Sequence, residues 1–181
     1  NEKAQALIQK ARAESPNDTA LMSAEADLAY KIGDINRYDE LMSKVAESDP
    51  DNPEIFLNLG IASAQIGNTE KAVEYYEKAL KLNPEYERVL INLAALKLSK
   101  DEQLVKEMNE LGTTSADYKK YDELKQQRQD NYKETLPYLE KAYKINPNNS
   151  DVVTTLMSIY GQIGDDANFK MMKAKLQELG Q

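Results

Sequence analysis

Residues 53–86 read PEIFLNLGIASAQIGNTEKAVEYYEKALKLNPEY, and this stretch decides the fold. Apolar and small residues recur in it at steps of three and four, both before and after Gly67, which predicts two amphipathic helices joined at that glycine. Gly67 suits a left-handed turn at the end of the first helix, and Pro84 cannot continue the second. Gly60 leaves room for a second helix to approach closely.

The order of residue types in this stretch resembles a tetratricopeptide repeat (TPR), a helix–turn–helix unit of 34 residues. The family pattern combines a large residue, Leu-Gly, a small residue, alanine, an aromatic residue, alanine and proline. Those positions are held here by Phe56, Leu59, Gly60, Ser63, Ala72, Tyr76, Ala79 and Pro84. The resemblance implies an all-α fold, a TPR-type α-solenoid built from antiparallel helix pairs.

The same register predicts a single array over residues 1–181. Its parts are 1–16, the second helix of a truncated repeat, and the repeats 17–50, 53–86, 87–147 and 150–180. The helix of 1–16 would expose an apolar face unless an upstream repeat or another molecule covered it. In the repeat 17–50, Glu25 stands where the family prefers leucine, so we interpret this repeat as degenerate.

The repeat 87–147 carries an insertion of residues 101–129 at the place of the turn glycine. Apolar residues keep helical spacing on both sides of Gly112, which favours an antiparallel helical hairpin with helices of about 87–111 and 116–145. A flexible loop is the rival interpretation, and the regular spacing argues against it. Contacts are expected across the hairpin between Leu104, Met108 and Leu111 on one side and Tyr118, Tyr121 and Leu124 on the other.

Composition excludes several classes of function. The net charge of -8 argues against a nucleic-acid partner, because phosphate binding needs a concentrated basic face. No apolar run approaches the roughly 20 residues that span a bilayer, so no membrane insertion is predicted. The chain has neither cysteine nor histidine, which removes the thiol nucleophile, the commonest general base and the commonest metal ligands. We therefore predict no catalytic residue, no metal site and no cofactor.

The resemblance implies that the first helices of the repeats line a concave groove that binds a protein or peptide partner. The residues expected there are Ser23, Asp27, Tyr30, Glu54, Asn58, Ile61, Gln65, Arg88, Asn92, Thr155 and Ser158. Asn58 and Arg88 match two positions of a carboxylate clamp known in one TPR subfamily, and one bound peptide is expected to touch both. Asp27 would repel a carboxylate, so that specificity is rejected.

The sequence thus predicts a non-enzymatic protein-interaction scaffold that binds a partner in the groove, through the projecting hairpin, or both. Two alternatives stay open: a self-assembly module that forms a homo-oligomer, and the helical appendage of a larger enzyme cut off at the N-terminus. Residues 136–142 and the insertion before them resemble TPR proteins of Gram-negative bacteria. Many of those are exported, so we expect a periplasmic or exported protein, with the cytoplasm as the alternative.

Overall fold

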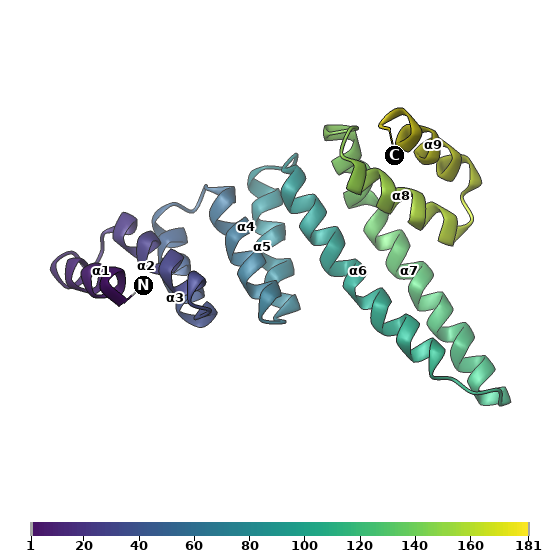
Figure 1. The fold of residues 1–181 in the computed structure, drawn as a ribbon, viewed down its shortest axis with the longest axis horizontal. Helices are drawn as coiled ribbons and strands as arrows, with labels where there is room; N and C mark the ends of the chain where they lie inside the picture. The colour runs from purple at the N-terminus through teal and green to yellow at the C-terminus, as the bar shows by residue number, and fades with distance from the viewer. Residues whose placement is uncertain (1, 181) are drawn as a thin grey trace. The chain divides into compact units, whose positions relative to one another are not determined.

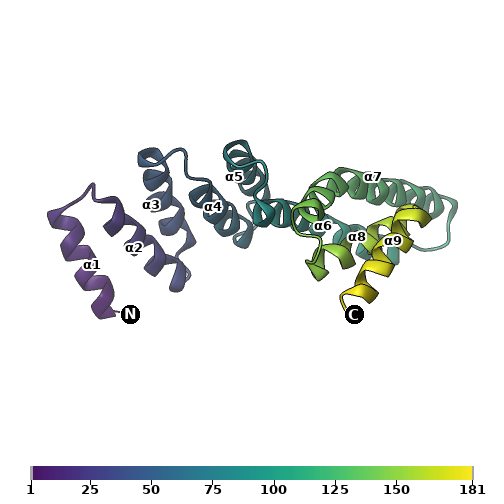
Figure 2. The ribbon, with the colours of Figure 1, turned by 90° about the horizontal axis from the view of Figure 1, so that it is seen from above.

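The structure, a computed structural model, describes residues 2–180, apart from the side chains of Glu2, Ala4 and Gln5. The end residues 1 and 181 of the predicted array lie outside this range. The described residues form nine α-helices and no strand (Figures 1 and 2), which confirms the predicted all-α fold. The chain divides into two compact units, Asn1–Pro84 and Glu85–Gln181. The division into repeats stays a prediction.

The first unit contains five helices, each packed against the next along the chain. They are α1 (Glu2–Glu14), α2 (Thr19–Lys31), α3 (Ile35–Ser48), α4 (Pro53–Gln65) and α5 (Thr69–Leu82). One continuous apolar core joins α2 to α5, because each helix buries the stripe that its apolar spacing predicts. Its buried residues are Met22, Ala26, Ala29, Tyr38, Leu41, Met42, Val45, Ala46, Ile55, Leu59, Ala62 and Tyr75.

Three helix pairs turn at a glycine, as the sequence analysis predicts for Gly67. Gly33, Gly67 and Gly164 have φ values of 82°, 75° and 78°, in the left-handed region that a side chain disfavours. At each turn the residue after the glycine donates its N–H to a carbonyl of the last helical turn, which ends the helix. The side chain of that same residue then caps the next helix; the caps are Asp34, Asn68 and Asp165.

The second unit contains α6 (Glu87–Asn109), α7 (Ser115–Ile145), α8 (Ser150–Ile163) and α9 (Asp166–Glu178). The first two run antiparallel, and their far ends continue past α8 and α9 (Figure 1). Helix α8 packs against α7 and in turn against α9. The elongated helical hairpin is therefore confirmed, and the interpretation of the insertion as a flexible loop is wrong. We call residues 101–129, the far part of α6 and α7, the arm.

The tip of the arm differs from the prediction. Leu124 is buried, with 1% of its surface exposed, but Tyr118 and Tyr121 are 63% and 44% exposed. Tyr118 lies in the first turn of α7, beside Asp117, whose side chain forms a capping box with Thr114. The expectation that both tyrosines pack across the hairpin was wrong.

An ion pair fastens the arm where it leaves the rest of the second unit. Arg128 donates two hydrogen bonds to the Asp101 carboxylate, from Nε to Oδ1 at 2.7 Å and from Nη2 to Oδ2 at 2.9 Å. The Tyr132 hydroxyl donates a third, of 2.6 Å, to Oδ2. Burial on its own would raise the pKa of Asp101, but the hydrogen bonds from Arg128 and Tyr132 outweigh it, and the pKa lies below its ordinary value.

A close helix contact of the first unit is that between Gly60 on α4 and Tyr76 on α5. A Cβ atom built at Gly60 would lie 2.4 Å from Cε1 of Tyr76. The tyrosine ring cannot move away at low cost, because only 2% of the residue is exposed. The absence of a side chain at position 60 is therefore what lets α4 and α5 pack at this distance.

We predict that Gly60→Ala destabilises the protein, although alanine is the better helix former by about 1 kcal/mol. Overpacking against Tyr76 is expected to cost about 1–3 kcal/mol, and Gly60→Leu more. Urea melts give the free energy of unfolding. In the Tyr76→Leu background the alanine penalty should shrink, because the two positions are coupled. A Gly60→Ala protein as stable as the wild type would contradict the close contact.

We predict that Asp101→Asn loosens the arm by about 1 kcal/mol, because the charged partner of Arg128 is lost. Amide hydrogen exchange of residues 101–129 measures this, with Asp122→Asn, an exposed arm carboxylate, as the matched control. The lowered pKa means that wild-type Asp101 stabilises the fold above about pH 4 and loses that effect as it is protonated at lower pH. The difference between wild type and Asp101→Asn should shrink in the same range. Equal exchange in both variants would show that the ion pair does not hold the arm.

Candidate functional site

Helices α2 and α4 bring together four of the residues predicted to line a groove. Asp27, Tyr30, Asn58 and Ile61 line one hollow of about 230 Å³ in the first unit, together with Tyr38 from α3. Asp27 and Tyr30 are one turn apart on α2. Asn58 and Ile61 are one turn apart on α4. Each helix therefore presents one face to the hollow. We call it the α2–α4 hollow.

Tyr30 is held in place although 37% of the residue is exposed. Its hydroxyl accepts a hydrogen bond of 2.6 Å from Nε2 of Gln65 on α4. Its ring is tilted at 55° against the ring of Tyr38, with the centroids 5.3 Å apart, within the range of favourable aromatic pairs. An exposed aromatic side chain fixed from two sides loses little freedom when it contacts a partner. Gln65, also predicted for the groove, thus acts on this surface through Tyr30.

Three polar groups of the hollow make no hydrogen bond to other residues in the described part of the chain: the Asp27 carboxylate, the Asn58 amide and the Tyr38 hydroxyl. Burial raises the pKa of Tyr38 to about 12, and the negative charge of Asp27 adds to the shift. The hydroxyl therefore stays protonated at neutral pH. The hollow offers hydrogen-bonding groups that the fold itself leaves unused.

Sequence reasoning missed Tyr38 as a site residue. Tyr38 belongs to the second helix of the repeat 17–50, and its ring is buried in the core. The side chain is long enough to belong to that core and still reach the hollow, which a periodic pattern of residue types does not reveal.

The other two groove residues predicted in the first unit lie elsewhere. Ser23 donates a hydrogen bond of 2.9 Å to the carbonyl of Thr19 and lines a separate hollow beside Met42 and Ile55. Glu54 is exposed in the first turn of α4. Neither lines the α2–α4 hollow.

In the second unit, the predicted residues lie on α6 and α8. Asn92 donates to the carbonyl of Arg88 at 2.7 Å, and Thr155 donates to the carbonyl of Asp151 at the same distance. Both side chains are thus directed back to their own helices. Ser158 is exposed on α8. Asn58 and Arg88 belong to different units, so a single peptide touching both stays a prediction.

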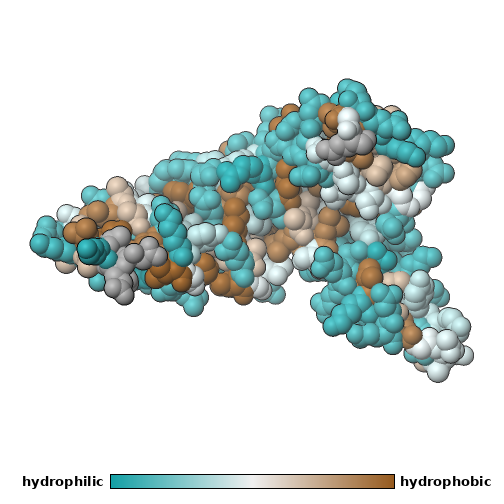
Figure 3. Space-filling view, viewed as in Figure 1, coloured by the Kyte–Doolittle hydropathy of each residue, from teal (hydrophilic) through white to brown (hydrophobic). Residues whose placement is uncertain are grey.

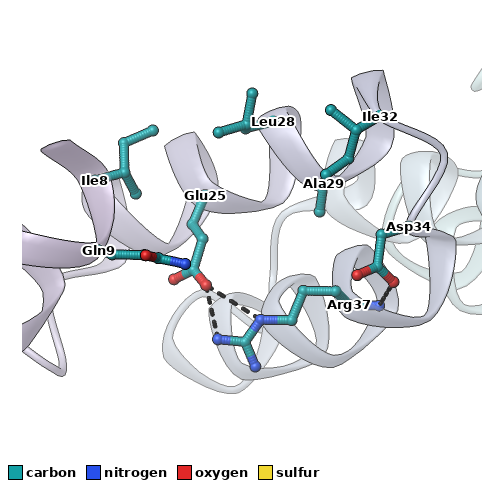
Figure 4. Close-up of a pocket in the computed structure, with 8 residues that line it drawn as sticks. All are labelled: Ile8, Gln9, Glu25, Leu28, Ala29, Ile32, Asp34 and Arg37. Carbon is teal, nitrogen blue, oxygen red and sulfur yellow. Dashed lines mark hydrogen bonds and ion pairs between the residues drawn. The ribbon is translucent and has the colours of Figure 1, made fainter. Parts of the chain in front are cut away.

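A second hollow in the first unit, of about 310 Å³, lies among α1, α2 and α3 (Figure 4). Glu25 accepts hydrogen bonds from Arg37 on α3 and, at 3.0 Å, from Arg12 on α1. Burial on its own would raise the pKa of Glu25, but these hydrogen bonds keep it below its ordinary value. Glu25 replaces the leucine of the family pattern with an ion-paired link among three helices. Both carboxylate oxygens of Glu25 are thus hydrogen-bonded within the fold.

The described residues contain no group of three or more His, Cys, Asp or Glu side chains placed to hold a metal ion. None of the described helices is both long and apolar enough to cross a bilayer.

Comparison with known proteins agrees with the fold. The family model for the tetratricopeptide repeat matches residues 53–86. The solved structures include the crystal structure of MamA, which superposes with a TM-score of 0.64 at 19% identity and covers 94% of this chain and 83% of that one. The MamA RS-1 double mutant gives a TM-score of 0.66 at 17% identity and covers 99% of this chain and 84% of that one. At these identities the likeness concerns the fold. Residues 53–86 thus form a tetratricopeptide repeat within an all-α fold.

Relatives by sequence include the photosystem I assembly protein Ycf3. The one from Rippkaea orientalis is 40% identical over 75 residues, which are 41% of this chain and 42% of that protein. The Acaryochloris marina protein is 29% identical over 144 residues, 79% of this chain and 76% of its own length. The match to Ycf3 of Cyanophora paradoxa, at 36% identity, covers 46% of that protein. The more identical matches thus span less than half of these relatives.

Proposed function

We propose that this chain is a non-enzymatic protein-interaction module that binds an extended segment of a partner protein in the α2–α4 hollow. The observation that carries the proposal is the convergence of unpaired polar groups on a fixed aromatic ring. Asp27 and Asn58 offer hydrogen bonds from two helices, and Tyr30 offers a large contact area at low entropic cost. Exposed aromatic anchors of this kind dominate many protein interfaces.

The likeness to a photosystem I assembly protein supports the same class of function. The absence of cysteine and histidine from the sequence agrees with this class. We extend only the general role to this chain, because the more identical matches cover less than half of the relatives' length.

The arm is the second candidate surface, as a site for another protein or for self-association. Tyr118 and Tyr121 are both exposed, and their spacing places them on the same side of α7. The visible face of the arm is otherwise mostly hydrophilic, with isolated hydrophobic spots (Figure 3). The two arm tyrosines lie on an exposed helix face, whereas in the α2–α4 hollow polar groups converge on a ring that is held in place. We therefore favour the hollow.

The immobilised chain should capture a partner from an extract of the cells that produce it, and single substitutions should identify the surface. We expect Tyr30→Ala and Asn58→Ala each to weaken binding of that partner about tenfold, the effect of an ordinary interface anchor. Lys78→Ala, on the outer face of α5, serves as the control and should bind as the wild type does. Calorimetric titration of the purified partner gives the affinities.

A variant in which residues 101–129 are deleted and replaced by a Gly-Asn turn shows whether the partner binds the α2–α4 hollow or the arm. If the hollow is the site, the deletion variant folds and keeps its affinity for the partner. Loss of binding or of self-association in the folded deletion variant, with Tyr30→Ala unaffected, would assign the function to the arm instead.

A further inference from the structure

We propose that the α2–α4 hollow selects a cationic side chain, lysine or arginine, of the bound segment. This inference rests on the proposed function and names the chemistry that it would recognise. It starts from the charge of the hollow, because Asp27 is the only ionised group among the five residues that line it.

The Asp27 carboxylate has no positive partner in the described part of the chain. Lys31 lies one turn further along α2, yet no ion pair joins it to Asp27. Two partly buried carboxylates of the first unit are paired, Glu25 with two arginines and Asp39 with Lys71, whereas Asp27 is exposed and unpaired. Asp27 is thus a charge that the fold leaves available to a partner.

The other walls of the hollow suit the same kind of ligand. The rings of Tyr30 and Tyr38 present π-systems, whose faces attract cations. The Asn58 amide oxygen is a further acceptor for an ammonium or guanidinium group. Ile61 provides an apolar wall for the methylene groups of a long basic side chain. A carboxylate ligand would be repelled by Asp27, and an apolar one would bury that charge without a partner.

The size of the hollow fits one side chain. Its volume of about 230 Å³ exceeds the share of a single water molecule, roughly 30 Å³, several times over. It is smaller than the roughly 300–1,000 Å³ typical of sites for complete small molecules. Because Tyr30 is already held by Gln65 and by the Tyr38 ring, the hollow needs little rearrangement to accept its ligand.

Selection from a phage-displayed library of random peptides against the complete chain tests the inference. We expect the wild-type chain to enrich peptides that share one dominant Lys or Arg position. Asp27→Asn should bind those peptides about fourfold more weakly, the effect of a lost exposed ion pair. Asp27→Lys should instead enrich Asp or Glu at that position. Asp51→Asn removes the same charge from an exposed turn of the first unit and should change nothing.

Circular dichroism establishes that each variant is folded, and the reversal by Asp27→Lys cannot arise from unfolding. The inference is overturned if wild-type-selected peptides show no basic preference, or if that preference survives Asp27→Asn. When such peptides still lose affinity with Tyr30→Ala and Asn58→Ala, the proposed function stands and only the cation specificity fails. Peptides insensitive to all three positions, or no enriched peptides at all, would overturn both.

Discussion

The close contact of Gly60 with the Tyr76 ring is the constraint on which the paired packing of α4 and α5 depends. It fixes which face of α4 is turned to α5. With about 100° of rotation per residue, Asn58, Ile61 and Gln65 lie about 100–160° around the helix from Gly60. One buried contact on one side of α4 therefore orients the polar and apolar groups that α4 presents with α2 on the other.

The features that follow from the regular spacing of residue types along the chain could be predicted from the sequence. The resemblance to the tetratricopeptide repeat implies that Asp27, Tyr30, Asn58 and Ile61 face one groove, and these four residues do share a hollow. The turn glycines and the hairpin follow from the same regular spacing. At the tip of the arm the period alone is not enough, because Tyr118 and Tyr121 continue the apolar spacing and are nevertheless exposed.

Side-chain pairing between helices could not be predicted in this way. Glu25 looks like a defect in a leucine position, yet Arg12 and Arg37 converge on it from neighbouring helices. Arg128 and Asp101 are 27 residues apart, and only the antiparallel packing of α6 and α7 brings them together. Long charged side chains reach partners that no short sequence pattern records. The same is true of Tyr38, whose ring fills the core and also reaches the candidate site.

In the proposed function, the partner binds a small surface whose hydrogen-bonding groups the fold leaves unpaired, on helices α2 and α4 that share one apolar core. Site-specific photocrosslinking tests this assignment most directly. A benzophenone amino acid at position 61, in the wall of the α2–α4 hollow, should crosslink the captured partner efficiently, and the same probe at position 78 should not. Equal crosslinking from both positions, or crosslinking from position 78 alone, would contradict the account.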